Sequence, residues 1–319
     1  MKPDLSTLKI SVVIPTYNEL QSLPVIVEEV IDVFLNVPYH LEILIIDNAS
    51  TDGTIELIRE LCKKHTFIKA IINSRNFGQI RSPFYGVIQA DGDAVIHLPS
   101  DGEVPTSVIP ALVFEWERGY RVVHAVKDYD VKNAQTYIKE LFQKLLNRYA
   151  STEMTFNSSG YGLLDKQVVL QMRKVRSIYP YYRGLLNEFA GQSGIVRYKH
   201  INRQNGLSKN NFLSLADYGL VGIVNYSKFP LRVMMLLGLL GAGISFLVGL
   251  GYVILKLLDW DGFQAGLVPL ISLSLFMHAL TVFFIGLLGE YIYHIFINTR
   301  GHPLVVEAEK INFGNKNLD

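Results

Sequence analysis

The sequence has little cysteine and almost no net charge, and it lacks the two common glycine-rich nucleotide motifs. Cys62 is the single cysteine among 319 residues, which excludes an internal disulfide framework and a multi-cysteine metal cage. The 30 Lys and Arg residues balance 29 Asp and Glu residues, so we expect no nucleic-acid partner. No G-x-G-x-x-G follows the first predicted strand and no G-x-x-x-x-G-K-[ST] occurs, which disfavours dinucleotide and P-loop sites.

Charge is also missing from two long stretches near the C-terminus. Residues 233–255 and 262–289 contain no Asp, Glu, Lys or Arg. Each stretch exceeds the roughly 20 residues that cross a bilayer core of about 30 Å. We therefore expect two transmembrane helices rather than a pair of buried core helices, because soluble helices rarely stay uncharged for this long.

The flanks of these stretches predict their orientation. Lys228, Arg232 and Arg300 lie outside the pair, whereas the short connector carries Asp259 and Asp261. The positive-inside rule then places both ends of the hairpin in the cytoplasm, so we expect a multi-pass protein of the cell (inner) membrane with cytoplasmic termini. The predicted parts are a cytoplasmic catalytic domain (1–210), a juxtamembrane linker or interfacial helix (211–230), two transmembrane helices (231–297) and a cytoplasmic tail (298–319).

The N-terminal part has the pattern of an open α/β sheet. Continuous apolar runs followed by turn signals are typical of strands that are buried on both faces of a parallel sheet. We predict strands over 10–14, 41–46, 68–72, 94–98 and 121–126, with helices over 23–34 and 78–90. The alternation of strands and helices indicates an α/β fold with a mostly parallel sheet, whose ligand site lies at the carboxyl ends of the strands.

Polar loops follow four consecutive predicted strands. They are PTYNE at 15–19, DNASTDGT at 47–54, SRNFGQ at 74–79 and PSDGE at 99–103. Any one of them could be ordinary turn chemistry, but four at successive strand ends favour a binding site. Asp52 is the exception, because it precedes a helical pattern and is expected to cap that helix.

The order of these motifs resembles glycosyltransferase family 2, whose catalytic domain has the GT-A fold. The segment KNNFLSLADYGLVGIVNYSKFPLR and the two predicted spans extend the resemblance over nearly the whole chain. With them the chain is similar to the polyprenyl-phosphate glycosyltransferases, the group of dolichol-phosphate mannose synthase and bacterial undecaprenyl-phosphate sugar transferases. The resemblance implies inverting transfer of a sugar from a nucleotide-diphosphate sugar to undecaprenyl or dolichyl phosphate at the cytoplasmic membrane face.

Two other functions compete with this one. A non-catalytic membrane partner on the same fold is suggested by departures from the family pattern at Pro99 and Gly160. A processive polysaccharide synthase is a weaker alternative, because neither Trp116 nor Trp260 stands in a QxxRW motif.

In the family, a D-x-D loop followed two residues later by Gln holds a divalent metal. The matching segment here is Pro99-Ser100-Asp101-Gly102-Glu103, which lacks the first Asp and has Glu in place of Gln. Hard oxygen ligands suit Mg²⁺ or Mn²⁺. The hypothesis is that Asp101 and Glu103 hold the metal, and the alternative is an acidic turn without a ligand role.

The resemblance also assigns the nucleotide and phosphate contacts. It implies a nucleotide site made of Pro15, Tyr17, Glu19, Ile46, Asp47, Pro99, Ser100, Asp101 and Lys127. Arg203 and Lys209, like Lys127, match family positions that contact the diphosphate or the lipid phosphate, where Arg supplies a fork of donors and Lys a compact charge. Both are predicted to be catalytic, together with Asp101 and Glu188.

The acceptor side departs from the family as well. Gly160 stands where the family has an Asp that is often proposed as the base. Loss of this base need not abolish the reaction, because a phosphate monoester, with a second pKa near about 6, is largely an anion at neutral pH. Glu188 could orient the acceptor or act as a base; otherwise it is a plain glutamate on a helix surface.

Two further features bear on the membrane. Residues 138–149 have an apolar stripe at helical spacing with Lys and Arg mostly outside it, which fits an interfacial helix or a helix packed on the sheet. Glycines in the predicted spans, among them Gly238 and Gly241, could permit close helix packing and a homo-oligomer.

Overall fold

The protein is described by a computed structural model that covers residues 7–128, 158–199, 229–258, 267–299 and 301–314. Arg203, Lys209 and the predicted amphipathic helix at 138–149 lie outside these residues. The elements in chain order are β1 (Lys9–Thr16), α1 (Ser22–Phe34), β2 (His40–Asp47), α2 (Thr54–Lys64), β3 (Ile68–Asn73), α3 (Gly78–Gln89), β4 (Ala94–His97), η2 (Thr106–Val108), α4 (Ile109–Glu117), β5 (Val122–Asp128), β6 (Ser158–Asp165), α6 (Lys166–Met172), α7 (Tyr182–Ala190), β7 (Ser193–Lys199), α9 (Phe229–Leu258), α10 (Leu267–Thr299) and β8 (Glu307–Ile311).

The described strands form one mixed sheet in the order β7-β5-β6-β4-β1-β2-β3-β8. The pairs β1–β2, β1–β4, β2–β3 and β5–β7 are parallel, whereas β6 and β8 run antiparallel to their neighbours. The carboxyl ends of β1 to β5 and the amino ends of β6 and β8 therefore share one edge of the sheet. We call this edge, with the loops on it, the site edge, and we call the opposite one the amino edge.

Helices cover both faces of the sheet. Strand residues such as Ile43 and Ile45 pack with α1, α2 and α4, whereas Leu44 and Ile46 pack with α3, α6 and α7. The central strands are apolar on both faces for this reason. The predicted strands, the two predicted helices and the α/β class with a mostly parallel sheet are confirmed.

α3 lies unusually close to the sheet. A Cβ atom on Gly86 would lie 2.8 Å from Cγ2 of Ile46 and 2.9 Å from Cγ1 of Val13. Only a residue without a side chain fits such an approach. Gly86 therefore sets the height of α3 above β1 and β2, and α3 in turn positions the loop that precedes it.

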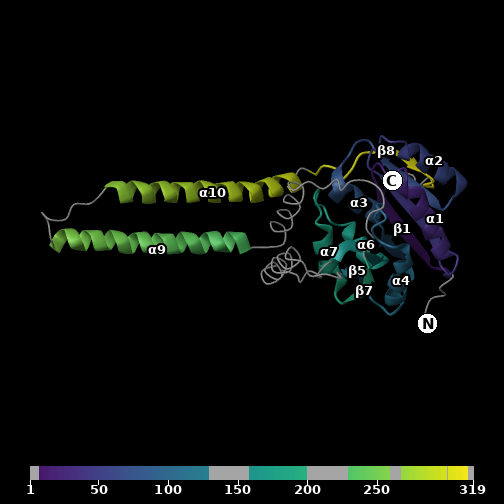
Figure 1. The fold of residues 1–319 in the computed structure, drawn as a ribbon, viewed down its shortest axis with the longest axis horizontal. Helices are drawn as coiled ribbons and strands as arrows, with labels where there is room; N and C mark the ends of the chain where they lie inside the picture. The colour runs from purple at the N-terminus through teal and green to yellow at the C-terminus, as the bar shows by residue number, and fades with distance from the viewer. Residues whose placement is uncertain (1–6, 129–157, 200–228, 259–266, 300, 315–319) are drawn as a thin grey trace.

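α9 and α10 lie side by side and project from the sheet domain (Figure 1). With 30 and 33 residues, they are about 45 and 50 Å long at about 1.5 Å per residue. Large apolar side chains are exposed along both helices, for example Leu239 and Phe283. Within the described residues, one segment, Phe276–Ile297, is long and apolar enough to cross a membrane, and a shorter apolar segment covers Leu247–Leu258.

The segment after α10 returns to the sheet, which the sequence did not predict. Residues 298–319 were expected to form a tail, and within them β8 pairs antiparallel with β3, with Asn73 opposite Glu307 and Ala70 opposite Ile311. The chain runs from α10 past α3 to β8, which lies beside α2 (Figure 1). β8 thus pairs with the outer side of β3, which would otherwise be an unpaired outermost strand.

Candidate active site

The loops after β1 and β2 bind each other through backbone amides and short polar side chains. Asn18 donates its N–H to Ser50 Oγ at 2.8 Å, and Thr51 donates its N–H to Asn18 Oδ1 at 2.8 Å. Asp52 Oδ1 accepts from Thr54 N–H at 3.1 Å, at the first residue of α2. The predicted capping role of Asp52 is therefore confirmed, and its Oδ2 also accepts from Leu20 N–H at 3.3 Å.

Asn48 joins the loop after β2 to the loop after β3. Its Oδ1 accepts from Phe77 N–H at 2.8 Å and from Asn73 Nδ2 at 3.2 Å. Its Nδ2 donates to Asn76 Oδ1 at 2.9 Å. Asn48 and Asn73 are buried, so these bonds satisfy both polar atoms of the Asn48 side chain and Nδ2 of Asn73, which would otherwise be costly to remove from water. These contacts were not predicted, because the only signal of these residues in the sequence is their position at strand ends.

The loop after β4 is fastened to β1. Ser100, which is 6% exposed, donates its hydroxyl to Pro15 O at 2.7 Å. Leu98 donates its N–H to Val13 O at 2.9 Å, which extends the pairing of the two strands. Pro15 is also the register partner of Ile46 on β2. The strand ends that carry Pro15 and Ile46 are therefore brought together with the loop that carries Pro99 and Ser100, as the sequence predicted.

The acidic loop and the end of β5 bring three predicted charges together. Asp101 Oδ1 accepts from Glu103 N–H at 3.1 Å around Gly102, whose φ is +71°. Glu103 Oε2 lies 3.4 Å from Lys127 Nζ, and all three charged residues are only partly buried. The structure thus places the predicted metal ligands beside a predicted phosphate contact.

The donor set at this loop fits a hard divalent cation. Mg²⁺ is usually bound by one or two carboxylates together with substrate phosphates and water, rather than by a complete protein cage. Asp101 and Glu103 supply two carboxylates, and among the described residues no group of three or more His, Cys, Asp and Glu side chains comes together. The loop therefore matches a cation that a diphosphate helps to hold.

Asp47 and Glu19, two other predicted nucleotide contacts, form hydrogen bonds with residues close to them in the chain. Asp47 is fully buried and accepts from Ser50 N–H at 2.9 Å and from Ser50 Oγ. Burial raises the pKa of the Asp47 carboxyl, although the hydrogen bonds from Ser50 oppose the shift. Glu19 Oε2 accepts from Ser22 Oγ at 2.6 Å. Tyr17, two residues before Glu19, is half-buried. Their binding role stays a prediction.

Gly160, on the predicted acceptor side, lies near the amino end of β6. Its φ of +85° lies in the left-handed region, and its carbonyl accepts from His97 Nδ1 at 3.0 Å. Because a carbonyl only accepts, Nδ1 of His97 carries the hydrogen, and burial lowers the pKa of His97 so that the ring stays neutral. The His97 ring meets Tyr182 edge-on at 5.4 Å. His97 was not predicted, since a lone His at a strand end gives no signal.

The structure does not bring Glu188 to Gly160. A Cβ atom on Gly160 would meet Tyr182 at 3.5 Å, in the first turn of α7. Glu188 is exposed and lies six residues further on, which is about 9 Å along the helix axis. Its catalytic role stays a prediction, as do those of Arg203 and Lys209, which lie outside the described residues.

Comparisons with known proteins cover both parts of the chain. The sequence model of glycosyl transferase family 2 matches residues 11–172, and that of the GtrB C-terminal hairpin matches residues 229–295. The chain is 32% identical to the bactoprenol glucosyl transferase of Shigella phage SfV, over 95% of this chain and 99% of that one. It is 30% identical to the prophage bactoprenol glucosyl transferase homolog of Escherichia coli (strain K12), over 93% and 97%.

Solved structures with a similar chain path include glucosyl-3-phosphoglycerate synthase from Mycobacterium tuberculosis in complex with uridine diphosphate. Its TM-score is 0.49 at 16% identity, with 68% of this chain and 80% of that one covered.

Proposed function

This chain belongs to glycosyl transferase family 2, and we propose that it transfers a sugar from a nucleotide-diphosphate sugar to a polyprenyl phosphate. The membership confirms the family and the GT-A fold that the motifs predicted. One observation carries the proposal: a site edge where Asp101, Glu103 and Lys127 meet is joined in one chain to a pair of exposed apolar helices. A nucleotide-sugar site and a lipid acceptor require these two features together. The names of the bactoprenol relatives support the lipid acceptor.

The proposed donor site handles the negative charge of the leaving nucleoside diphosphate. Asp101 and Glu103 would hold Mg²⁺ or Mn²⁺, which supplies charge neutralisation at the departing phosphate. Lys127 now faces Glu103 at 3.4 Å, and its ammonium would pair with phosphate oxygens once Glu103 binds the cation. Ser100 keeps the acidic loop against β1, so these groups are held in place before the substrate arrives. Pro15, Tyr17, Glu19, Ile46, Asp47 and Pro99 remain the proposed base and ribose contacts.

The proposed acceptor chemistry needs no protein base at Gly160. The phosphate monoester already carries the negative charge that attacks the anomeric carbon, and one attack from the face opposite the leaving group inverts that carbon. The left-handed backbone at Gly160 and its bond to His97 shape the acceptor side. Arg203 and Lys209 are proposed to bind the phosphates, and Glu188 to orient the acceptor.

We further propose that α9 and α10 cross the inner membrane with both ends in the cytoplasm. The exposed apolar side chains of both helices support this placement, because such a surface is stable in lipid and not in water. The catalytic domain, residues 1–210, would then lie at the cytoplasmic face of the membrane, on the side where nucleotide sugars are made. A homo-oligomer remains a prediction; a Cβ atom on Gly241 would lie 3.6 Å from the Met277 methyl, so this glycine faces α10 of its own chain.

The test gives membranes that contain the protein a panel of labelled nucleotide sugars, undecaprenyl phosphate and Mn²⁺. We expect label in the organic phase for one donor, and loss of that label when EDTA removes the cation. Membranes without the protein are the control. Absence of label for every donor would contradict the proposed function, and label that persists in EDTA would contradict the metal.

A further inference from the structure

The segment Pro303–Asn312, which we call the strap, connects the end of α10 to the sheet. It contains β8 and ends on Asn312, whose Nδ2 donates to Cys62 O and to Ile68 O, both at 2.8 Å. Glu309 on its outer side forms a 2.7 Å ion pair with Arg59 of α2. The strap is thus bound along its length, by a backbone ladder and by side chains at its far end.

The first half of the strap is bound to α3 and to the loop after β3, at the site edge. Arg81 of α3 donates from Nε to Leu304 O at 2.7 Å and from Nη2 to Pro303 O at 2.9 Å. Ser74, the first residue of the loop after β3, donates its N–H to Val306 O at 2.9 Å. This is the loop whose Phe77 and Asn76 bind Asn48. The strap is therefore bound directly to a loop that Asn48 joins to the loop after β2.

The strap is also the short connection between the helices and the sheet domain. Three residues, 300–302, separate Thr299 at the end of α10 from Pro303, so the two ends lie at most about 15 Å apart. The connection at the other end, from β7 to α9, has 29 residues, 200–228. Chain length sets no tight limit there. The distance between α10 and the site edge is therefore limited by the strap.

We propose that the strap is a positioning element of the transfer reaction. It holds α10 at a fixed distance from the loops of the site edge, which carry the proposed donor contacts, so that the phosphate of a membrane-embedded lipid meets the donor sugar. Arg81 is the positioning residue that fastens it, and it acts through the strap rather than on the substrate. This inference rests on the proposed function. Small misplacements of reacting groups lower rates strongly, so a loosened strap should lower the turnover of a lipid held in the bilayer.

The test lengthens the connection and leaves the strap itself unchanged. A 12-residue Gly-Ser linker is inserted between Gly301 and His302, which are exposed and precede every strap contact. The same linker after Gly314, beyond the strap, is the matched control. Transfer is measured to undecaprenyl phosphate in phosphatidylethanolamine–phosphatidylglycerol vesicles and, in parallel, to citronellyl phosphate, a short acceptor that reaches the site from water.

We expect kcat for undecaprenyl phosphate to fall about tenfold, with unchanged kcat for citronellyl phosphate and unchanged KM for the nucleotide sugar. Arg81→Met should give the same pattern with a smaller loss, and Arg59→Met should not. If the linker variant and Arg81→Met lose equal activity with both acceptors, the strap has only a structural role and the inference is overturned. If neither variant loses activity with either acceptor, the strap has no effect on transfer and the inference is likewise overturned. A wild-type protein that transfers to neither acceptor would instead refute the proposed function, and the inference with it.

Discussion

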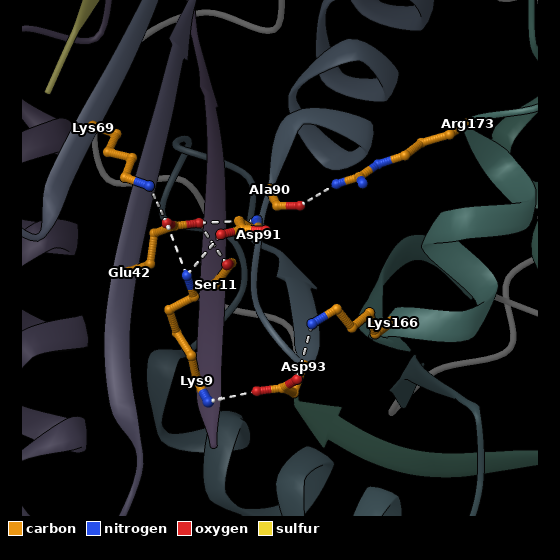
Figure 2. Close-up of polar contacts among 9 residues, drawn as sticks. All are labelled: Lys9, Ser11, Glu42, Lys69, Ala90, Asp91, Asp93, Lys166 and Arg173. Atoms are coloured by element: carbon orange, nitrogen blue, oxygen red, sulfur yellow. Dashed lines mark hydrogen bonds and ion pairs between the residues drawn. The ribbon is translucent and has the colours of Figure 1, made fainter. Parts of the chain in front are cut away.

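The two edges of the sheet use the same kinds of charged residue in opposite ways. At the amino edge, Lys69, Ser11 and Lys9 converge on Glu42 (Figure 2). Glu42 is 3% exposed; it lies 2.6 Å from Lys69 Nζ and accepts from Ser11 Oγ at 2.7 Å and from Asp91 N–H at 3.1 Å. Burial alone would raise the pKa of Glu42, but these bonds outweigh it, so the pKa is lowered and the carboxylate stays charged.

At the site edge, Glu103 and Lys127 are partly exposed and 3.4 Å apart. Asp101 is also partly exposed, and its Oδ1 accepts from the backbone N–H of Glu103 at 3.1 Å. A charge that is buried among short bonds cannot change partner without a large penalty, whereas a partly exposed charge with a longer contact can do so. The charge at the amino edge therefore stabilises the fold, whereas the charges at the site edge are more exposed and are held by a longer ion pair.

The largest expected effect comes from Asp101→Asn. It removes one of two proposed metal carboxylates and keeps the size of the side chain, so we expect kcat to fall about a thousandfold, or about 4 kcal/mol. Thermal stability should hardly change. Labelled sugar transfer at saturating Mn²⁺ measures the loss. Asp91→Asn is the matched control at the amino edge, where the carboxylate is exposed, and should keep full activity. Full metal-dependent turnover in Asp101→Asn would contradict the proposal that Asp101 holds the metal.

Glu42→Gln should have the reverse signature. Lys69 and Lys9 would lose their buried partner, and because both lysines keep some solvent exposure we expect a loss of about 2 kcal/mol rather than the full cost of a buried pair. Transfer per folded molecule should stay near wild type. Denaturant unfolding followed by fluorescence measures the loss. Lys166→Gln, which breaks an exposed pair with Asp93, is the control and should cost less than about 0.5 kcal/mol. Equal losses in the two variants would be inconsistent with a special role for Glu42.

The pH dependence of stability should differ between the wild type and Glu42→Gln. The folded-state pKa of Glu42 lies below its ordinary 4.5, so its contribution is fully present above about pH 4.5. The contribution is lost as the pH falls through the lower folded value, because the unfolded state then binds more protons. The wild-type melting temperature should therefore fall more steeply below pH 4.5 than that of Glu42→Gln. Parallel curves would show that Glu42 does not carry this dependence.

The smallest effect is expected on the acceptor side. Gly160→Asp restores the residue type that the family has at this position, and a Cβ would find ordinary contact distances there. The left-handed φ of +85° costs about 1 kcal/mol. We expect no gain in kcat, since the phosphate is already anionic, and a KM for the acceptor raised a few-fold by repulsion between like charges. Gly160→Asn is the neutral control and should leave KM near wild type. A faster Gly160→Asp enzyme would show that the missing base limits the rate.

The central strands and the four loops could be predicted because their signals are local. A strand buried on both faces, such as Ile43 to Ile46, is a continuous apolar run, and polar loop residues at its end mark the site edge. Asp101, Glu103 and Lys127 lie at the carboxyl ends of β4 and β5, which run in the same direction with the antiparallel strand β6 between them. These features depend on the sequence near each residue and on one rule of sheet topology.

The remaining features depend on partners that are distant in sequence. β8 is a five-residue strand, EAEKI, with alternating exposure, and its partner β3 lies more than 230 residues earlier in the chain. Asn48 looks like any turn residue until the fold brings Asn76 to it. Helical spacing likewise places Glu188 on α7 but does not show where that helix points, so the link to Gly160 could not be judged from sequence.

The position of β8 in the chain has a consequence for biosynthesis. A ribosome makes β3 early and β8 only after both long helices, so the outer side of β3 stays without its partner while those helices are being made. Such an open edge invites pairing with other chains. β8 therefore completes the sheet only after both long helices have been made, and a chain that stalls between β3 and β8 is left with an aggregation-prone strand.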